Sequence, residues 1–184
     1  MTPGNLFICL LFLFAACTSR PVSDHPYTTD GLTMNLPPYW NVVPDGIDTA
    51  ISADRVIAFI NKDPQSKGAS LAIWIENDTS DIKVNLQTVV NVSRNRMTKL
   101  NIPFQLLKTN EAILIGTKHV LRARFKCEEP GHPTLGIATV FRMEGKTYHV
   151  IYMTCDEINP DNTALIDKII RSMKKFDLKD LPAN

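Results

Sequence analysis

The segment from residue 104 to residue 155 constrains the fold most, because it is a series of strand-like stretches joined by short turns. The stretches are rich in β-branched, aromatic and other apolar residues, which is typical of strands. The stretches cover residues 104–110, 111–127, 134–143 and 146–155. We expect the second to be one long strand that bends or bulges at Gly116. Glu144 and Gly145 predict a tight hairpin turn, and the last stretch, apolar on both faces, predicts a central strand.

Three further strand-like stretches come earlier in the chain. LTMNLPPYW alternates until Pro37 and Pro38 end the strand, and Trp40 is an expected core residue. Residues 55–62 and 68–76 are strand-like as well, and DPQSKG between them is typical of a hairpin turn.

Two segments have the helical period. From about Asp81 to Leu100 the apolar residues fall on one helical face, and Ser80 is a candidate N-cap. A second helix is expected over about residues 160–175, with Asn159 as its cap.

This order of elements resembles the PsbP/Mog-like (DcrB-like) domain family. The likeness rests on LTMNLPPYW, GKTYHVIYMTC and ALIDKIIRSMKKF and covers about residues 31–176. It implies an α+β fold, an α/β sandwich in which a long middle helix and a C-terminal helix pack on an antiparallel sheet. Members of that family mostly act as binding or assembly modules, so no common catalytic motif carries over.

The start of the chain predicts export. Residues 6–14 form an unbroken apolar run, shorter than the roughly 20 residues that span a bilayer and typical of a signal peptide. Ala15, Ala16 and Cys17 follow, and this resembles the lipobox of bacterial lipoproteins. The resemblance implies cleavage before Cys17 and attachment of acyl chains such as palmitate to that residue. A plain secretory signal and a retained anchor helix are the alternatives.

These patterns divide the chain into four parts. We expect a signal peptide over residues 1–16, a flexible spacer over 17–29, one α+β domain over 30–178 and a tail over 179–184. Thr18, which follows the lipidated position, favours the outer membrane, with the domain facing the periplasm. The formal net charge of +1 argues against a nucleic-acid partner.

The remaining cysteines, Cys127 and Cys155, predict a disulfide, because an even pair outside the cytoplasm is usually bridged. An intervening strand would hold them about 9.6 Å apart, farther than the roughly 7 Å that a bridge tolerates. Two free thiols therefore stay possible. A zinc site formed by Cys127, Cys155 and His132 is another alternative. A calcium site is a further alternative, built from the acidic residues Glu128, Glu129, Asp156 and Glu157.

The candidate catalytic motifs in the sequence are weak. The GKT at residues 145–147 lacks the glycine that a phosphate loop needs five positions earlier, where Val140 stands. His119 and His149 lie in predicted strands, where a structural role is the usual one. We therefore expect a non-catalytic, cofactor-free envelope module with a protein partner. The alternative is a domain that binds a small ligand or metal between helix and sheet, and an enzyme is the least favoured hypothesis.

Overall fold

The computed structural model describes residues 23–29, 31–43, 55–63, 68–129, 132–155 and 160–175. The predicted signal peptide, Cys17 and the predicted tail lie outside these residues. No helix in the described part is both long and apolar enough to cross a bilayer.

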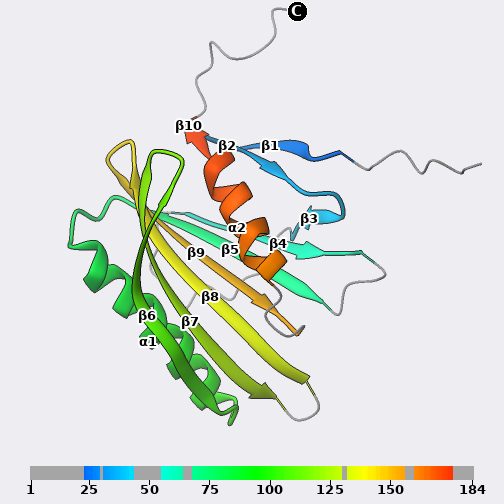
Figure 1. Ribbon diagram of the computed structural model, residues 1–184, viewed down its shortest axis with the longest axis vertical. Coiled ribbons are helices and arrows are strands. Elements are labelled where there is room, and N and C mark those ends of the chain that lie inside the picture. Colours follow the sequence, from blue (N-terminus) through cyan, green and yellow to red (C-terminus); the bar gives the residue numbers. More distant parts are fainter. Residues whose placement is uncertain are drawn as a thin grey trace, which may run out of the picture.

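One large antiparallel sheet dominates the described fold. Its strands are β3 (Trp40–Val42), β4 (Arg55–Asn61), β5 (Ala69–Glu76), β6 (Phe104–Ile115), β7 (Lys118–Glu129), β8 (His132–Met143) and β9 (Lys146–Thr154). They are hydrogen-bonded in the order β3-β4-β5-β9-β8-β7-β6 (Figure 1). The expected hairpin of β4 and β5 is confirmed, and β9 is central, as predicted.

A second, smaller sheet and two helices complete the described fold. The small sheet has the order β1-β2-β10, formed by β1 (His25–Thr29), β2 (Leu32–Leu36) and β10 (Lys174–Lys175). The helices are α1 (Ile82–Lys99) and α2 (Pro160–Ser172). Helix α1 lies on one face of the large sheet, and α2 and the small sheet lie on the other (Figure 1). The structure thus confirms antiparallel sheets combined with helices.

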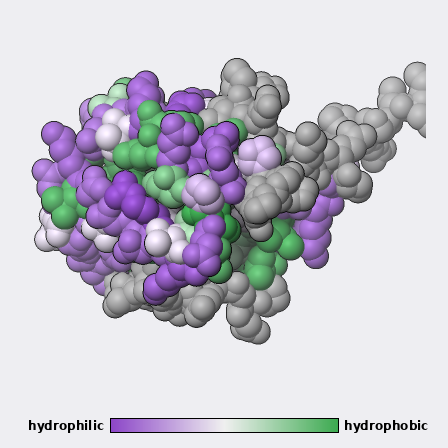
Figure 2. All heavy atoms as spheres, turned by 90° about the horizontal axis from the view of Figure 1, so that it is seen from below, coloured by the Kyte–Doolittle hydropathy of each residue, from purple (hydrophilic) through white to green (hydrophobic). Residues whose placement is uncertain are grey.

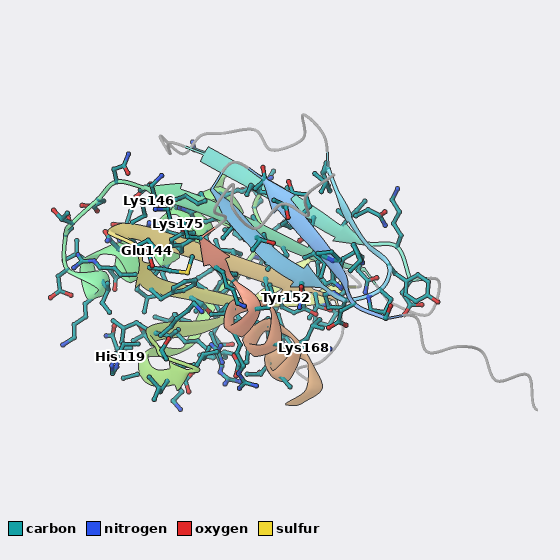
Figure 3. All side chains as sticks on the ribbon, turned by 90° about the horizontal axis from the view of Figure 1, so that it is seen from above. His119, Glu144, Lys146, Tyr152, Lys168 and Lys175 are labelled. Atoms are coloured by element: carbon teal, nitrogen blue, oxygen red, sulfur yellow. The ribbon has the colours of Figure 1, made fainter. Side chains whose placement is uncertain are left out.

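Two apolar cores separate these layers. The first lies under α2 and β2 and contains Trp40, which is 2% exposed, as predicted. The centroid of its indole lies 6.2 Å from the centroid of the Tyr152 ring. Figure 3 shows Tyr152 on the sheet near α2. The second core lies under α1 and includes Leu86, Val89 and Phe125.

The turns show one correct and one wrong prediction. Glu144 and Gly145 both have positive φ and form the tight turn between β8 and β9 (Figure 3). Residues 111–127 are not one strand. Gly116, at φ +62°, starts a hairpin turn between β6 and β7, so the chain reverses where we expected a bend. The irregularity in pairing lies instead in β6, between Leu106 and Glu111.

Three element boundaries also differ from expectation. The predicted spacer ends earlier, because His25–Thr29 forms β1 and pairs with all of β2. The N-cap of α1 is Asp81 rather than Ser80, since the Asp81 carboxylate accepts a hydrogen bond from the Lys83 amide. Helix α2 ends at Ser172, and the last two residues of the expected helix form β10. The predicted cap Asn159 lies outside the described residues.

Candidate functional site

Helix α1 covers only part of its face of the large sheet. Its first turn is fixed by the Asp81 carboxylate, which lies 2.8 Å from the Lys83 amide nitrogen. Its buried side chains pack mainly on β6, β7 and β8. The same face of β4, β5 and β9 is therefore left beside the helix instead of under it.

An apolar groove runs in this uncovered region, between the C-terminal half of α1 and the sheet. We call it the apolar compartment; its volume is about 470 Å³. Val92, Met97 and Leu100 of the helix end form one wall. The opposite wall and the floor come from β4, β5 and β9 and include Val56, Ala58, Ala72, Ile151 and Met153.

The register of the sheet explains why these small and apolar side chains meet. Ala72 pairs with Ala58 on one side and with Ile151 on the other, so all three point to the α1 face. Two adjacent alanines leave room that larger side chains would fill. Ser93, Arg96 and Thr134 add a few polar groups to the lining. Such a mainly apolar cavity with few polar groups is typical of small-ligand sites.

A second hollow of about 210 Å³ lies beside the N-terminal half of α1. We call it the polar compartment, because Glu76, Asp78, Asn85 and His149 line it. Glu76 ends β5, and His149 lies on the neighbouring strand β9. The two strands are paired antiparallel, and this pairing brings groups together that are 73 positions apart in the sequence.

His149 is the most unusual group in the polar compartment. Its side chain is 3% exposed and stacks on Trp74 at 5.6 Å between ring centroids. Its Nε2 lies 3.1 Å from Glu76 Oε2, while its buried Nδ1 has no hydrogen-bond partner among the described residues. Burial lowers the pKa of His149 to about 4, although the charge of Asp78 opposes the shift. The imidazole is therefore neutral at pH 7, with Nε2–H donating to Glu76 and Nδ1 left as an acceptor.

The loop that carries Asp78 is held in place by hydrogen bonds. The Asp78 carboxylate accepts hydrogen bonds from the Ser80 amide and hydroxyl, both at 2.7 Å, and these bonds lower its pKa. Thr147 Oγ1 donates to the Asp78 carbonyl at 2.7 Å, and Arg142 donates to the carbonyls of Thr79 and Ser80. The polar compartment thus presents the Asp78 carboxylate on an anchored loop and the Glu76 carboxylate on the end of β5.

The two compartments are neighbours. Trp74 and Val92 line both, so together these two residues form the boundary between them. Taken together, the two linings follow α1 from Val84 to Leu100, which is about 24 Å of helix at 1.5 Å per residue. Figure 2 shows hydrophobic residues reaching the surface between hydrophilic ones on the face of the molecule seen from below.

The predicted disulfide between Cys127 and Cys155 is not formed in the structure, where both are free thiols. Strand β8 lies between their strands: Cys127 pairs with Thr134, and Thr134 Oγ1 lies 3.8 Å from Cys155 Sγ on the other side. Two interstrand spacings exceed the reach of a disulfide. Cys127 instead lines the apolar compartment, and burial raises the pKa of its thiol to about 11.

The metal-site alternatives gain no support from the described residues. Among them, no three His, Cys, Asp or Glu side chains come together to hold an ion. Of the calcium candidates, Glu128 forms an ion pair with Lys126 at 2.9 Å. Asp156 and Glu157 lie outside the described residues, as do the side chains of Glu129 and His132.

Neither compartment was predicted from the sequence as a specific site; a pocket between helix and sheet was considered, but without its residues. The usable signal was the pair Trp74 and His149, two large side chains in separate strand-like stretches. Its significance depends on the register of β5 and β9, which the local pattern leaves undetermined.

No protein-family model matches this chain, and no curated protein matches it either. Solved structures do match. The solution structure of cyanobacterial PsbP (CyanoP) from Synechocystis is 15% identical, with 89% of this chain and 99% of that chain covered and a TM-score of 0.61. A mutant of the protein Mog1 is 10% identical, with 85% and 98% covered and a TM-score of 0.55.

A protein from Bacteroides thetaiotaomicron is similar over only part of its length. It is 13% identical, with 84% of this chain but 49% of that chain covered and a TM-score of 0.53. At these identities the similarity concerns the fold. The chain thus has the PsbP/Mog1-like fold that the order of its predicted elements indicated.

Proposed function

We propose that this chain is a non-catalytic binding module of the bacterial cell envelope, anchored by lipid on Cys17, that holds an apolar small ligand in the groove beside α1. The observation that carries the proposal is the apolar compartment of about 470 Å³. Its volume falls within the roughly 300–1,000 Å³ of small-ligand sites. Its apolar lining gains free energy when a ligand covers it and removes it from water.

The lipid anchor rests on the sequence of residues 6–17. The apolar run that ends in Ala15, Ala16 and Cys17 supports cleavage and acylation at Cys17. Several acyl chains give a membrane tether that does not readily dissociate. The outer membrane, with the domain facing the periplasm, is the location that we propose.

The alternative, an assembly module with a protein partner, would use an exposed apolar patch. The exposed large apolar side chains of the described part are divided among separate elements. The set consists of Val84 and Leu100 near opposite ends of α1, Leu107 and Leu114 on β6, Ile60 on β4, Val42 on β3 and Tyr39 just before β3. A concave groove is the better-formed feature, so it favours a small ligand over a protein as the occupant.

A groove-filling variant tests the proposal. Ala72→Trp places an indole inside the apolar compartment, whereas Leu114→Trp places the same group at a side chain that is 63% exposed on β6. Nile red, a neutral dye that fluoresces in apolar sites, should bind the wild type and Leu114→Trp equally. Its binding to Ala72→Trp should be at least tenfold weaker. Equal binding by all three proteins would contradict the proposed site.

A further inference from the structure

The polar compartment indicates what kind of ligand the groove would take. Because Trp74 and Val92 line both compartments, a ligand lying along α1 would place one end beside each of two chemically different linings. One lining is mainly aliphatic, and the other holds two carboxylates and an imidazole. A ligand that matches both is an amphiphile with an apolar chain and a polar head group.

The hydrogen-bonding groups that the polar compartment offers to a ligand are mainly acceptors, because the donors of Ser80, Asn85 and Thr88 in its lining already donate within the protein. The carboxylates of Glu76 and Asp78 can only accept, and the neutral His149 directs its Nε2–H to Glu76 at 3.1 Å. The buried Nδ1 of His149, which has no partner among the described residues, is an acceptor too. A head group that donates hydrogen bonds is complementary to this set, and a head group that only accepts is not.

The charge of the polar compartment also favours a head group that donates hydrogen bonds. The lining of the polar compartment contains Glu76 and Asp78 but no Lys or Arg among its described residues. Arg142 is nearby, but its guanidinium donates to the backbone carbonyls of Thr79 and Ser80. The compartment is therefore anionic, and it favours a cationic donor over a neutral one.

We propose that the groove binds an amphiphile that carries a protonated amine, with the alkyl chain in the apolar compartment and the ammonium group between Glu76 and Asp78. This inference rests on the proposed function and adds the chemical class of the ligand. The ammonium group supplies three donors and a positive charge to two carboxylates. A carboxylate head would meet like charges there and bind weakly.

The fluorescence of Trp74 can report whether a ligand occupies the groove. The chain has two tryptophans, and Trp40 lies in the other core, so Trp40→Phe leaves Trp74 as the single reporter at the boundary of the compartments. Bromine atoms on a dodecyl chain quench the fluorescence of an indole that the chain contacts. Brominated dodecylamine, dodecanol and dodecanoate should be titrated into the full chain, kept in solution with a bile-salt detergent that has no alkyl chain.

We expect dodecylamine at pH 7 to quench Trp74 with an affinity about tenfold or more above that of the alcohol and the carboxylate. Glu76→Gln and Asp78→Asn should each remove most of that preference. Glu111→Gln is the matched control, because Glu111 lies on β6, outside both compartments, and pairs with Lys108 and Arg124. It should leave the preference unchanged.

The outcomes separate the two proposals. Equal affinity for all three head groups, or tighter binding of dodecanoate, would overturn the ammonium inference while leaving an apolar groove in place. Retention of the amine preference in both Glu76→Gln and Asp78→Asn would also overturn it. Absence of quenching by every probe would overturn the inference together with the proposed function.

Discussion

Gly136 shows at the scale of one residue how tightly the core under α1 is packed. It lies opposite Phe125 in the β7–β8 pairing, and the ring of Phe125 occupies the place where a side chain would stand. A Cβ at Gly136 would lie 2.1 Å from that ring. Phe125 is fully buried and stacks on Phe104 at 4.9 Å, so its ring has little room to move away.

We therefore expect Gly136→Ala to lower the free energy of unfolding by about 1–3 kcal/mol. Urea denaturation measures this directly. The double variant Gly136→Ala with Phe125→Leu should recover part of the loss, because a smaller side chain relieves the clash. A Gly136→Ala protein as stable as the wild type would contradict the packing described here.

His149 gives the fold a predicted pH dependence. Its pKa in the folded protein is about 4, below the usual 6.5, because burial disfavours the charged form. The unfolded chain thus binds more protons than the folded one between these two values, and stability falls as pH drops from 6.5 toward 4. The loss attributable to His149 is at most about 3 kcal/mol.

The measurement compares urea denaturation at pH 7 and pH 4.5. We expect His149→Gln to show a smaller loss of stability on acidification than the wild type. His119→Gln, a change at an exposed histidine of β7, serves as the control and should behave like the wild type. Identical pH profiles for His149→Gln and the wild type would show that His149 is not held neutral by burial.

At the scale of elements, the sequence predicted what local periodicity determines. Leu32, Met34 and Leu36 alternate and form β2, and the helical spacing of Leu86, Val89 and Val90 gives α1. Gly116 was ambiguous, because a glycine in an alternating stretch is compatible with a bulge and with a turn. Only the pairing of β6 with β7 decides between them.

Strand β1 was missed because its sequence, HPYTT, contains one large apolar side chain. That side chain, Tyr27, packs edge-on against the fully buried Phe59 with 5.1 Å between ring centroids. The strand is stabilised by its pairing with β2 rather than by its own composition. A short polar stretch therefore becomes part of the fold through its pairing with the next strand and one aromatic contact to β4.

We predict that Tyr27→Ala destabilises the domain by about 1–3 kcal/mol, because it uncovers Phe59. His25→Ala, at an exposed position of the same strand, should cost less than about 0.5 kcal/mol. Thermal unfolding of the two variants makes the comparison. Equal stability of both variants would mean that β1 behaves as the flexible spacer first expected.

At the scale of the whole molecule, the resemblance to the PsbP/Mog-like family predicted antiparallel sheets combined with helices, whereas the site was not predictable. Strand and helix periods along the chain indicated most of the individual elements. The groove depends on how far α1 extends over the sheet and on which alanines of β4 and β5 face it. These are consequences of three-dimensional packing, and no local pattern in the sequence encodes them.

The lipid anchor is a prediction at this scale as well. Cys17→Ser should abolish incorporation of a fatty-acid analogue and leave the chain unprocessed or released from membranes. Metabolic labelling followed by fractionation of the cell envelope checks both effects. Equal labelling of wild type and variant would show that Cys17 carries no lipid.

The central claim is that the native protein carries an apolar ligand in the groove beside α1. The most direct measurement is mass spectrometry of the organic extract from wild type, Ala72→Trp and Leu114→Trp proteins purified from cell envelopes. We predict one amphiphile, chemically unchanged, in stoichiometric amount with wild type and Leu114→Trp and at least tenfold depleted with Ala72→Trp. The same extract from all three proteins, or a cleaved product in place of an intact ligand, would contradict the account.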